Sequence, residues 1–400
     1  PTAAPAVGAY YLLSFLILGF VQGSCIGISI LLSQSVGANT ATTTRSYFTI
    51  GEWLSVVLCL LLTPLMTLGT NYYLQWLNTP NNILAMAETF TLISFIGIPA
   101  NILFNYLAAA LRAFGDAIHP LHFLVFSLIV NVVLDLLFIC QFHLGIAGAA
   151  WATVISEFIG GLLNLSRFFW GQNQLKLTSS DWRISWAKLK RMCAIGLPMG
   201  FEYSVSAIGA IIMQDAINQL GSAIMAAQSA ADKIRQLFTL PMESVGAAMA
   251  TYQAQNFGAR NRDRIKRGIL NGCLIQIIHS FGAFGILWFS RRTLVTAILG
   301  NGSPTTTASA LQYLTIIAFF FPVHGLLMIF RNTIQGWGHS FYAIVSGFGE
   351  LAGRLVASLL ALTPLGFVAI CYAKPFAWLI SLISCGFISR FIRKNGLPKP

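Results

Sequence analysis

Asn131 and Asp135 stand four residues apart in the apolar sequence NVVLD, a spacing that places both side chains on one face of a helix. A carboxylate among apolar residues is costly unless it is protonated, binds a cation or accepts hydrogen bonds. Asn131 supplies an amide oxygen beside Asp135, and Asn105 and Thr153 lie in the neighbouring apolar segments. These four residues predict an oxygen-rich site for a proton or a sodium ion.

Three further acidic residues interrupt apolar sequence in the second half of the chain. Glu202 follows Pro198 by about one helical turn, where a proline frees backbone groups, and we expect its carboxylate to face a cavity. Asp232 and Glu243 are two further candidates for binding a cationic substrate. The alternatives are a structural hydrogen bond for Glu202 and mutual neutralisation of Asp232 with Arg235, three residues further on.

Pro99 and Pro322 stand within apolar segments of the two halves, and we expect each to kink its helix. A kink that changes during a conformational cycle acts as a hinge, whereas a fixed kink only serves packing. We predict that both prolines are hinges.

The composition shows which solvent these residues face. Of the 400 residues, 56% are hydrophobic and only 9% are charged, whereas roughly a quarter of the residues of a soluble protein are charged. The seven cysteines are scattered without a CxxC pair, so we interpret them as apolar fillers and expect no metal site. The sequence therefore predicts an all-α integral membrane protein, because lipid offers no hydrogen-bonding partner to unpaired backbone groups.

Segments long enough to cross a bilayer need about 20 apolar residues each. The sequence contains eleven of them, near 9–34, 47–69, 86–111, 119–140, 145–168, 194–219, 222–256, 265–289, 307–335, 339–362 and 366–391. A polar linker with interfacial tryptophans separates the fifth from the sixth. We expect an N-terminal bundle over 1–170, a cytoplasmic linker over 171–193 and a C-terminal bundle over 194–400.

The basic residues indicate how the segments are oriented. Most of the 24 lysines and arginines lie in loops on one side, including the run FGARNRDRIKRG, whereas the opposite loops hold Arg291 and Arg292. The positive-inside rule places the basic loops and the C-terminus in the cytoplasm of a multi-pass plasma membrane protein. The basic run then anchors the chain at anionic lipid. We expect no nucleic-acid partner, because no aromatic interleaving accompanies the run.

The two halves repeat each other at an offset of 221 to 223 residues. SQSVGANTATTTR aligns with QAQNFGARNRDRIK, Pro99 with Pro322, Gly115 with Gly338 and Gly145 with Gly366. The repeat relates segments that run in the same direction, so the bundles are parallel. The partner of the sixth segment would precede residue 1, which predicts twelve helices, six plus six, in the intact protein and a missing first helix here.

The chain resembles the multidrug and toxic compound extrusion (MATE) family of cation-coupled exporters over nearly its whole length. GLPMGFEYSVSAIG, PMESVGAAMATYQAQNFGARNRDRIKRG and ALRAFGD carry the resemblance. It implies two six-helix bundles around a cavity and export of amphipathic, often cationic compounds in exchange for protons or sodium ions. It also implies that Asn105, Asn131, Asp135 and Thr153 correspond to the coupling residues of the N-terminal bundle.

We therefore predict a secondary-active antiporter that works by alternating access, as a monomer among membrane lipids, with no enzymatic step and no cofactor besides H⁺ or Na⁺. One alternative is a flippase for lipid-linked precursors, which would need a strongly cationic cavity, and Arg331, Arg354 and Lys374 favour it. Another is a membrane-embedded transferase, but the six histidines are scattered without ligand spacing.

Overall fold

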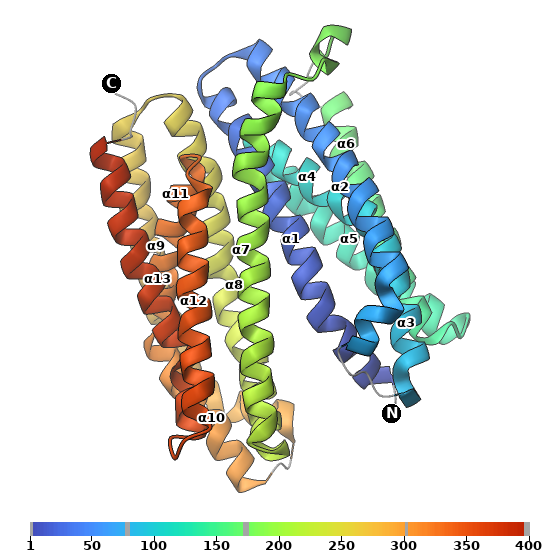
Figure 1. Cartoon of the computed structure of the whole chain (residues 1–400), viewed down its shortest axis with the longest axis vertical. Coiled ribbons are helices and arrows are strands. Elements are labelled where there is room, and N and C mark those ends of the chain that lie inside the picture. The colour runs from blue at the N-terminus through green and yellow to red at the C-terminus, as the bar shows by residue number, and fades with distance from the viewer. Residues whose placement is uncertain (1–2, 77–80, 171–175, 301–302, 396–400) are drawn as a thin grey trace. The chain divides into compact units, whose positions relative to one another are not determined.

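The computed structural model describes residues 3–76, 81–170, 176–300 and 303–395, and this part of the chain is almost entirely helical (Figure 1). It divides into two compact units, Pro1–Ser204 and Val205–Pro400. The first unit contains α1 (Ala3–Gly37), α2 (Ala41–Trp76), α3 (Asn81–Ile96), α4 (Ile98–Ala113), α5 (Ile118–Leu136), the π-helix η1 (Leu137–Gln141), α6 (Gly145–Trp170) and the 3₁₀-helix η2 (Ser179–Trp182). The second contains α8 (Ser222–Gly258), α9 (Arg262–Leu299), α10 (Pro304–Phe319), α11 (Phe321–Gly336), α12 (Ser340–Ala361) and α13 (Phe367–Asn395).

Helix α7 (Trp186–Gln219) belongs to both units, since the boundary falls between Ser204 and Val205. The predicted linker over 171–193 contains η2 and the start of α7, and its residues 171–175 lie outside the described part. The linker is held to the N-terminal unit through Asp181, whose side chain caps η2 and accepts a hydrogen bond from Arg45 Nε at 3.1 Å.

Within the described residues, eight helices are long and apolar enough to cross a membrane, or ten spans if each of two bent pairs counts as one. Helix α8 is not among them, and it carries Asp232, Lys233, Arg235 and Glu243. Each of the eleven predicted segments nevertheless corresponds to one helix or to one bent pair. This arrangement confirms the predicted all-α class.

The two bent pairs contain the two predicted kinks. Helices α3 and α4 meet at 43°, with Pro99 in the first turn of α4. Helices α10 and α11 meet at 50°, with Pro322 in the first turn of α11. A proline is tolerated in a first turn, where its missing N–H has no intrahelical acceptor, but it prevents the preceding helix from continuing straight.

The repeat is visible in the backbone of the turns. Gly115 and Gly338 have φ of +89° and +82°, and Gly145 and Gly366 have φ of +56° and +51°. Only glycine adopts such left-handed conformations without strain, so these pairs are retained for a conformational reason. Asn39 and Arg260, again 221 residues apart, both have φ of +53°. The two units thus turn the chain in the same way at corresponding points.

Each unit has a packed interior. In the N-terminal unit Tyr106 is buried and donates a hydrogen bond from its hydroxyl to the carbonyl oxygen of Phe48 at 2.9 Å. In the C-terminal unit Tyr313, Phe321 and Trp337 belong to one buried cluster. Many large apolar side chains on the outer helix faces remain exposed, as expected for helices whose solvent is lipid.

Candidate functional site in the N-terminal unit

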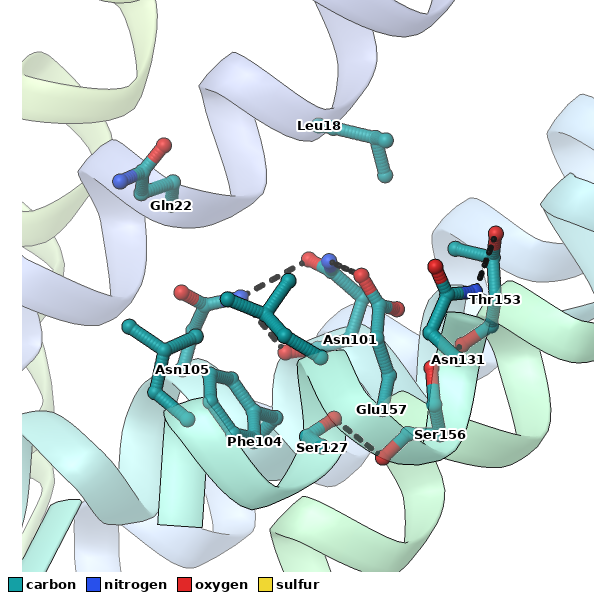
Figure 2. Close-up of a pocket in the computed structure, with 12 residues that line it drawn as sticks. Leu18, Gln22, Asn101, Phe104, Asn105, Ser127, Asn131, Thr153, Ser156 and Glu157 are labelled. Carbon is teal, nitrogen blue, oxygen red and sulfur yellow. Dashed lines mark hydrogen bonds between the residues drawn. The ribbon is translucent and has the colours of Figure 1, made fainter. Parts of the chain in front are cut away.

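A cavity of about 350 Å³ opens between four helices of the N-terminal unit (Figure 2). Its lining follows helical spacing, because residues three or four positions apart share a helix face. The lining residues are Leu18 and Gln22 of α1, Asn101, Phe104 and Asn105 of α4, Leu124, Ser127, Leu128 and Asn131 of α5, and Thr153, Ser156 and Glu157 of α6.

Glu157 and two asparagines form a continuous hydrogen-bonded chain along one wall of this cavity. Asn101 Nδ2 donates to Glu157 Oε1 at 3.0 Å, and Asn105 Nδ2 donates to Asn101 Oδ1 at 3.1 Å (Figure 2). No lysine or arginine of the described residues forms an ion pair with Glu157. An ionised Glu157 is therefore stabilised only by its amide donor or by a cation that enters the cavity.

The opposite wall joins α5 to α6. Asn131 Nδ2 lies 3.4 Å from Thr153 Oγ1, and Ser127 Oγ donates to the carbonyl oxygen of Ser156 at 2.6 Å (Figure 2). Amide, hydroxyl and carboxylate oxygens therefore line the same cavity. Such a donor set suits a hard cation with oxygen ligands, as well as a proton held by the carboxylate.

Small residues on α6 let α4 approach closely enough to form the first wall. A Cβ added at Gly160 would lie 2.7 Å from a ring carbon of Phe104, and one added at Gly161 would lie 2.9 Å from Leu103 Cδ2. The two glycines follow Glu157 by about one turn. They therefore fix the distance between the Asn101 and Glu157 side chains.

Three of the four predicted coupling residues, Asn105, Asn131 and Thr153, line this cavity. Asp135 does not line it, although it stands one turn after Asn131 on the same helix. Its Oδ1 atom is enclosed and has no hydrogen-bond partner among the described residues. The helix continues from this point as the π-helix η1, a widened turn that often marks functional sites.

The sequence did not predict a role for Glu157, Asn101 or Gln22. A signal was present, since Asn101 precedes Asn105 and Thr153 precedes Glu157 by four residues, the same spacing that singled out Asn131 and Asp135. The acidic residue of the cavity thus comes from α6.

The acidic residues predicted for a substrate cavity lie elsewhere. Glu202 is buried in α7 and does not line the described cavity. Asp232 Oδ1 accepts hydrogen bonds from Lys374 Nζ at 2.6 Å, Arg235 Nε at 2.9 Å and the Tyr313 hydroxyl at 2.9 Å. The expected neutralisation by Arg235 is therefore present, with a second cation added by Lys374.

Glu243 is the most accessible of the three, with a side chain 49% exposed. Its Oε1 lies 3.8 Å from Nε2 of His324, whose ring packs against Trp378 with 4.3 Å between centroids.

A second buried ion-pair group surrounds Glu350 of α12, a residue that was not singled out in the sequence. Arg331 forms an ion pair with Glu350 Oε1, and Arg354 Nη2 lies 3.3 Å from Glu350 Oε2. The positions that repeat Arg354 and Lys374 in the first half are Asn131 and Thr153. The two units therefore have similar backbone conformations at corresponding turns but different polar residues in their interiors.

The MatE family model matches residues 3–137 and 198–351. The chain belongs to the MatE family. Its members are transporters and not enzymes, which removes the transferase alternative and makes this chain a multi-pass membrane protein of the multidrug efflux transporter family.

Curated relatives include two probable multidrug resistance proteins of Bacillus subtilis. YpnP is 28% identical over 272 residues, which cover 68% of this chain and 60% of YpnP. YoeA is 23% identical over 403 residues, covering 98% of this chain and 87% of YoeA.

Solved structures share the fold. An outward-facing multidrug resistance MATE family transporter superposes with a TM-score of 0.91 at 18% identity, covering 99% of this chain and 88% of the other. A transporter of the MOP superfamily from Pyrococcus furiosus Vc1, described as having a binding pocket of reverse polarity, superposes with a TM-score of 0.93 at 18% identity. That match covers all of this chain and 90% of the other.

Proposed function

We propose that this protein exports amphipathic cationic compounds across the plasma membrane in exchange for a proton or a sodium ion. The observation that carries the proposal is the N-terminal cavity, where Glu157 has amide partners and an oxygen-rich space beside it but no basic partner among the described residues. An ionisable residue at membrane depth is costly, and such residues typically mark ion or proton pathways. The proposed mechanism involves no cofactor besides the coupling ion.

In the proposed cycle, a proton or Na⁺ binds between Glu157, Asn101, Asn105, Asn131 and Thr153. Binding neutralises the carboxylate and changes its hydrogen bonds to α4, so that the ion favours one conformation of the transporter. Substrate favours the other, and Glu243, as an exposed carboxylate of the C-terminal unit, is proposed to attract its positive charge. Pro99 and Pro322 are proposed as the hinges.

The flippase alternative depends on a strongly cationic cavity, and the contacts of its three supporting residues weaken it. Arg331 and Arg354 both pair with Glu350, and Lys374 pairs with Asp232. Together with Arg235, these cations share two carboxylates, so about half of their charge is compensated within the unit. We therefore propose an exporter of cationic compounds in preference to a carrier of anionic lipid-linked precursors.

Transport measurements on three matched variants test the coupling site. Glu157→Gln keeps the side-chain shape but removes the charge, and we expect at least about a tenfold loss of dye efflux, since a charged hydrogen bond contributes roughly 1.5–3 kcal/mol. Asp135→Asn tests the alternative coupling carboxylate one turn from the cavity. Glu88→Gln in α3, outside the cavity, is the control.

The assay uses purified protein in vesicles. A proton gradient and a sodium gradient are imposed in separate experiments, so that transport driven by each ion is measured separately. Efflux by Glu157→Gln equal to that of Glu88→Gln would rule out Glu157 as the coupling residue. Loss of efflux in Asp135→Asn alone would move the coupling site to Asp135.

A further inference from the structure

A second cavity, shallow and open to the surface, has a volume of about 540 Å³ and lies at one end of the C-terminal unit, where α9 begins and α13 ends. The near ends of these helices are visible beside the C-terminus in Figure 1. Lys266 of α9 lines it together with Arg390, Phe391, Arg393 and Lys394 of α13. Four of its five lining residues are therefore cations, contributed by two helices that are distant in sequence.

These cations differ from the buried basic residues of the same unit, because they have no carboxylate partner among the described residues. Arg235, Arg331, Arg354 and Lys374 each form an ion pair with a carboxylate. None of the cations that line the second cavity pairs with a carboxylate of the described residues. Asp263 is the one acidic residue in the first turn of α9, and it does not line the cavity. A concave group of uncompensated cations attracts anions.

Exposed apolar residues follow the lining residues along the same two helices. Leu270 and Leu274 follow Lys266 at intervals of four residues and are 69% and 56% exposed. Ile383 and Phe387 precede Phe391 at the same interval and are 51% and 70% exposed. Residues four apart share a helix face, so each helix presents one stripe that is apolar along its length and cationic at its end.

We propose that this cavity binds the phosphate headgroup of an anionic phospholipid, with the acyl chains along the Leu270 and Phe387 faces. A phosphate diester offers oxygens to arginine and lysine donors, and the apolar stripes match the tails. A soluble phosphate would use the cations but leave the two stripes without a role. The proposal does not depend on the transported substrate or on the coupling ion.

The test compares lipid binding by two variants that lose the same charge. The cavity variant is Lys266→Gln/Arg390→Gln/Arg393→Gln/Lys394→Gln, and the control variant is Lys176→Gln/Arg183→Gln/Lys190→Gln/Arg191→Gln, four exposed cations of the linker and the start of α7. Native mass spectrometry and thermal unfolding of purified protein in detergent measure binding of phosphatidylglycerol, phosphatidylcholine and inorganic phosphate.

We expect phosphatidylglycerol to bind and stabilise the unmodified protein more than phosphatidylcholine does. The cavity variant should bind phosphatidylglycerol at least about tenfold more weakly, because each surface cation contributes roughly 1 kcal/mol toward an anionic membrane lipid, and the control variant should bind as the unmodified protein does. Equal losses in both variants would show a diffuse charge effect and overturn the site. Stabilisation by inorganic phosphate equal to that by phosphatidylglycerol would overturn the lipid as its ligand.

Folding of the cavity variant is checked by its elution profile and by its unfolding temperature without lipid. The double variants Lys266→Gln/Arg390→Gln and Arg393→Gln/Lys394→Gln give the same comparison with smaller changes. Each should weaken phosphatidylglycerol binding severalfold, and unchanged binding in both would also overturn the proposal.

Discussion

Asp116 connects three segments of the N-terminal unit through its two carboxylate oxygens. Oδ2 accepts from Arg167 Nε at 3.0 Å, and Oδ1 accepts from the backbone nitrogen of His119 at 3.2 Å and lies 2.9 Å from its Nδ1. Partial burial raises the pKa of Asp116, but the hydrogen bonds from His119 and Arg167 outweigh it and hold the pKa below its usual range. This carboxylate is therefore stabilised as an anion at the end of α4, α5 and α6.

The lowered pKa makes a prediction about acid stability. A carboxylate with a lowered folded-state pKa contributes stability that is present above the unfolded pKa, about 3.9, and is lost as the pH falls through the folded value. We expect Asp116→Asn to lower stability at pH 7 by about 1.5–3 kcal/mol, the range for hydrogen bonds to a charged group. The difference from the unmodified protein should shrink below about pH 4.

Thermal unfolding in detergent between pH 3 and pH 7 measures this difference. Glu88→Gln, which changes one acid elsewhere in the unit, is the control. A destabilisation by Asp116→Asn that stays the same at pH 3 and pH 7 would show that charge is not the cause.

At the scale of helices, α12 and α13 depend on a glycine for their close packing. A Cβ added at Gly353 would lie 2.9 Å from the Cα of Ala377, a backbone atom that cannot turn aside. We expect Gly353→Ala to destabilise the protein by about 1–3 kcal/mol, as is typical of overpacking. Gly386→Ala on α13 is the matched control, since its added Cβ would meet no atom within 4 Å.

Unfolding temperatures of the two alanine variants test this packing. Alanine favours a helix over glycine by about 1 kcal/mol, so Gly386→Ala should be neutral or stabilising. Equal unfolding temperatures for the two variants would show that α12 and α13 can move apart without cost.

The bends at the two prolines carry a prediction about movement. Replacing Pro322 by alanine restores a backbone N–H in the first turn of α11 and removes the ring that disfavours a straight helix. We expect Pro322→Ala to slow transport severalfold while the amount of folded protein stays the same. Turnover in vesicles, normalised to folded protein, measures it, and an unchanged rate would identify the bend as a fixed feature of packing.

The sequence predicted the helices well but left their ends and breaks undetermined. The segment predicted over 47–69 is part of α2, which runs from Ala41 to Trp76, because hydropathy detects only the apolar part of a helix that continues into the interface. The prolines predicted kinks, yet the division of each span into two helices depends on tertiary packing. The π-helix after Asp135 has no sequence signal of its own.

The candidate site was predicted only in part for a related reason. Asn105, Asn131 and Thr153 were found because polar residues are rare in apolar segments, and they do line one cavity. Which acidic residue joins them depends on how α4, α5 and α6 are rotated about their axes. The close packing of α6 against α4 at Gly160 and Gly161 accompanies the contact between Glu157 and Asn101.

At the scale of the whole molecule, the distribution of charge predicts the orientation in the membrane. With the basic loops in the cytoplasm, a cysteine at Asn261, between α8 and α9, should react with an impermeant reagent only in opened cells. A cysteine at Thr363, between α12 and α13, should react in intact cells. Both are introduced into a variant without the seven native cysteines. The reverse labelling pattern would contradict the orientation.

The boundary between the two compact units lies within the continuous helix α7, after Ser204. A loop is a flexible connection. A helix has a fixed rise of about 1.5 Å per residue, and it resists twisting because its backbone hydrogen bonds would break. The segment of α7 across this boundary is therefore a stiff connection and not a flexible one. Helix α7 thus joins the two units by an unbroken helical backbone.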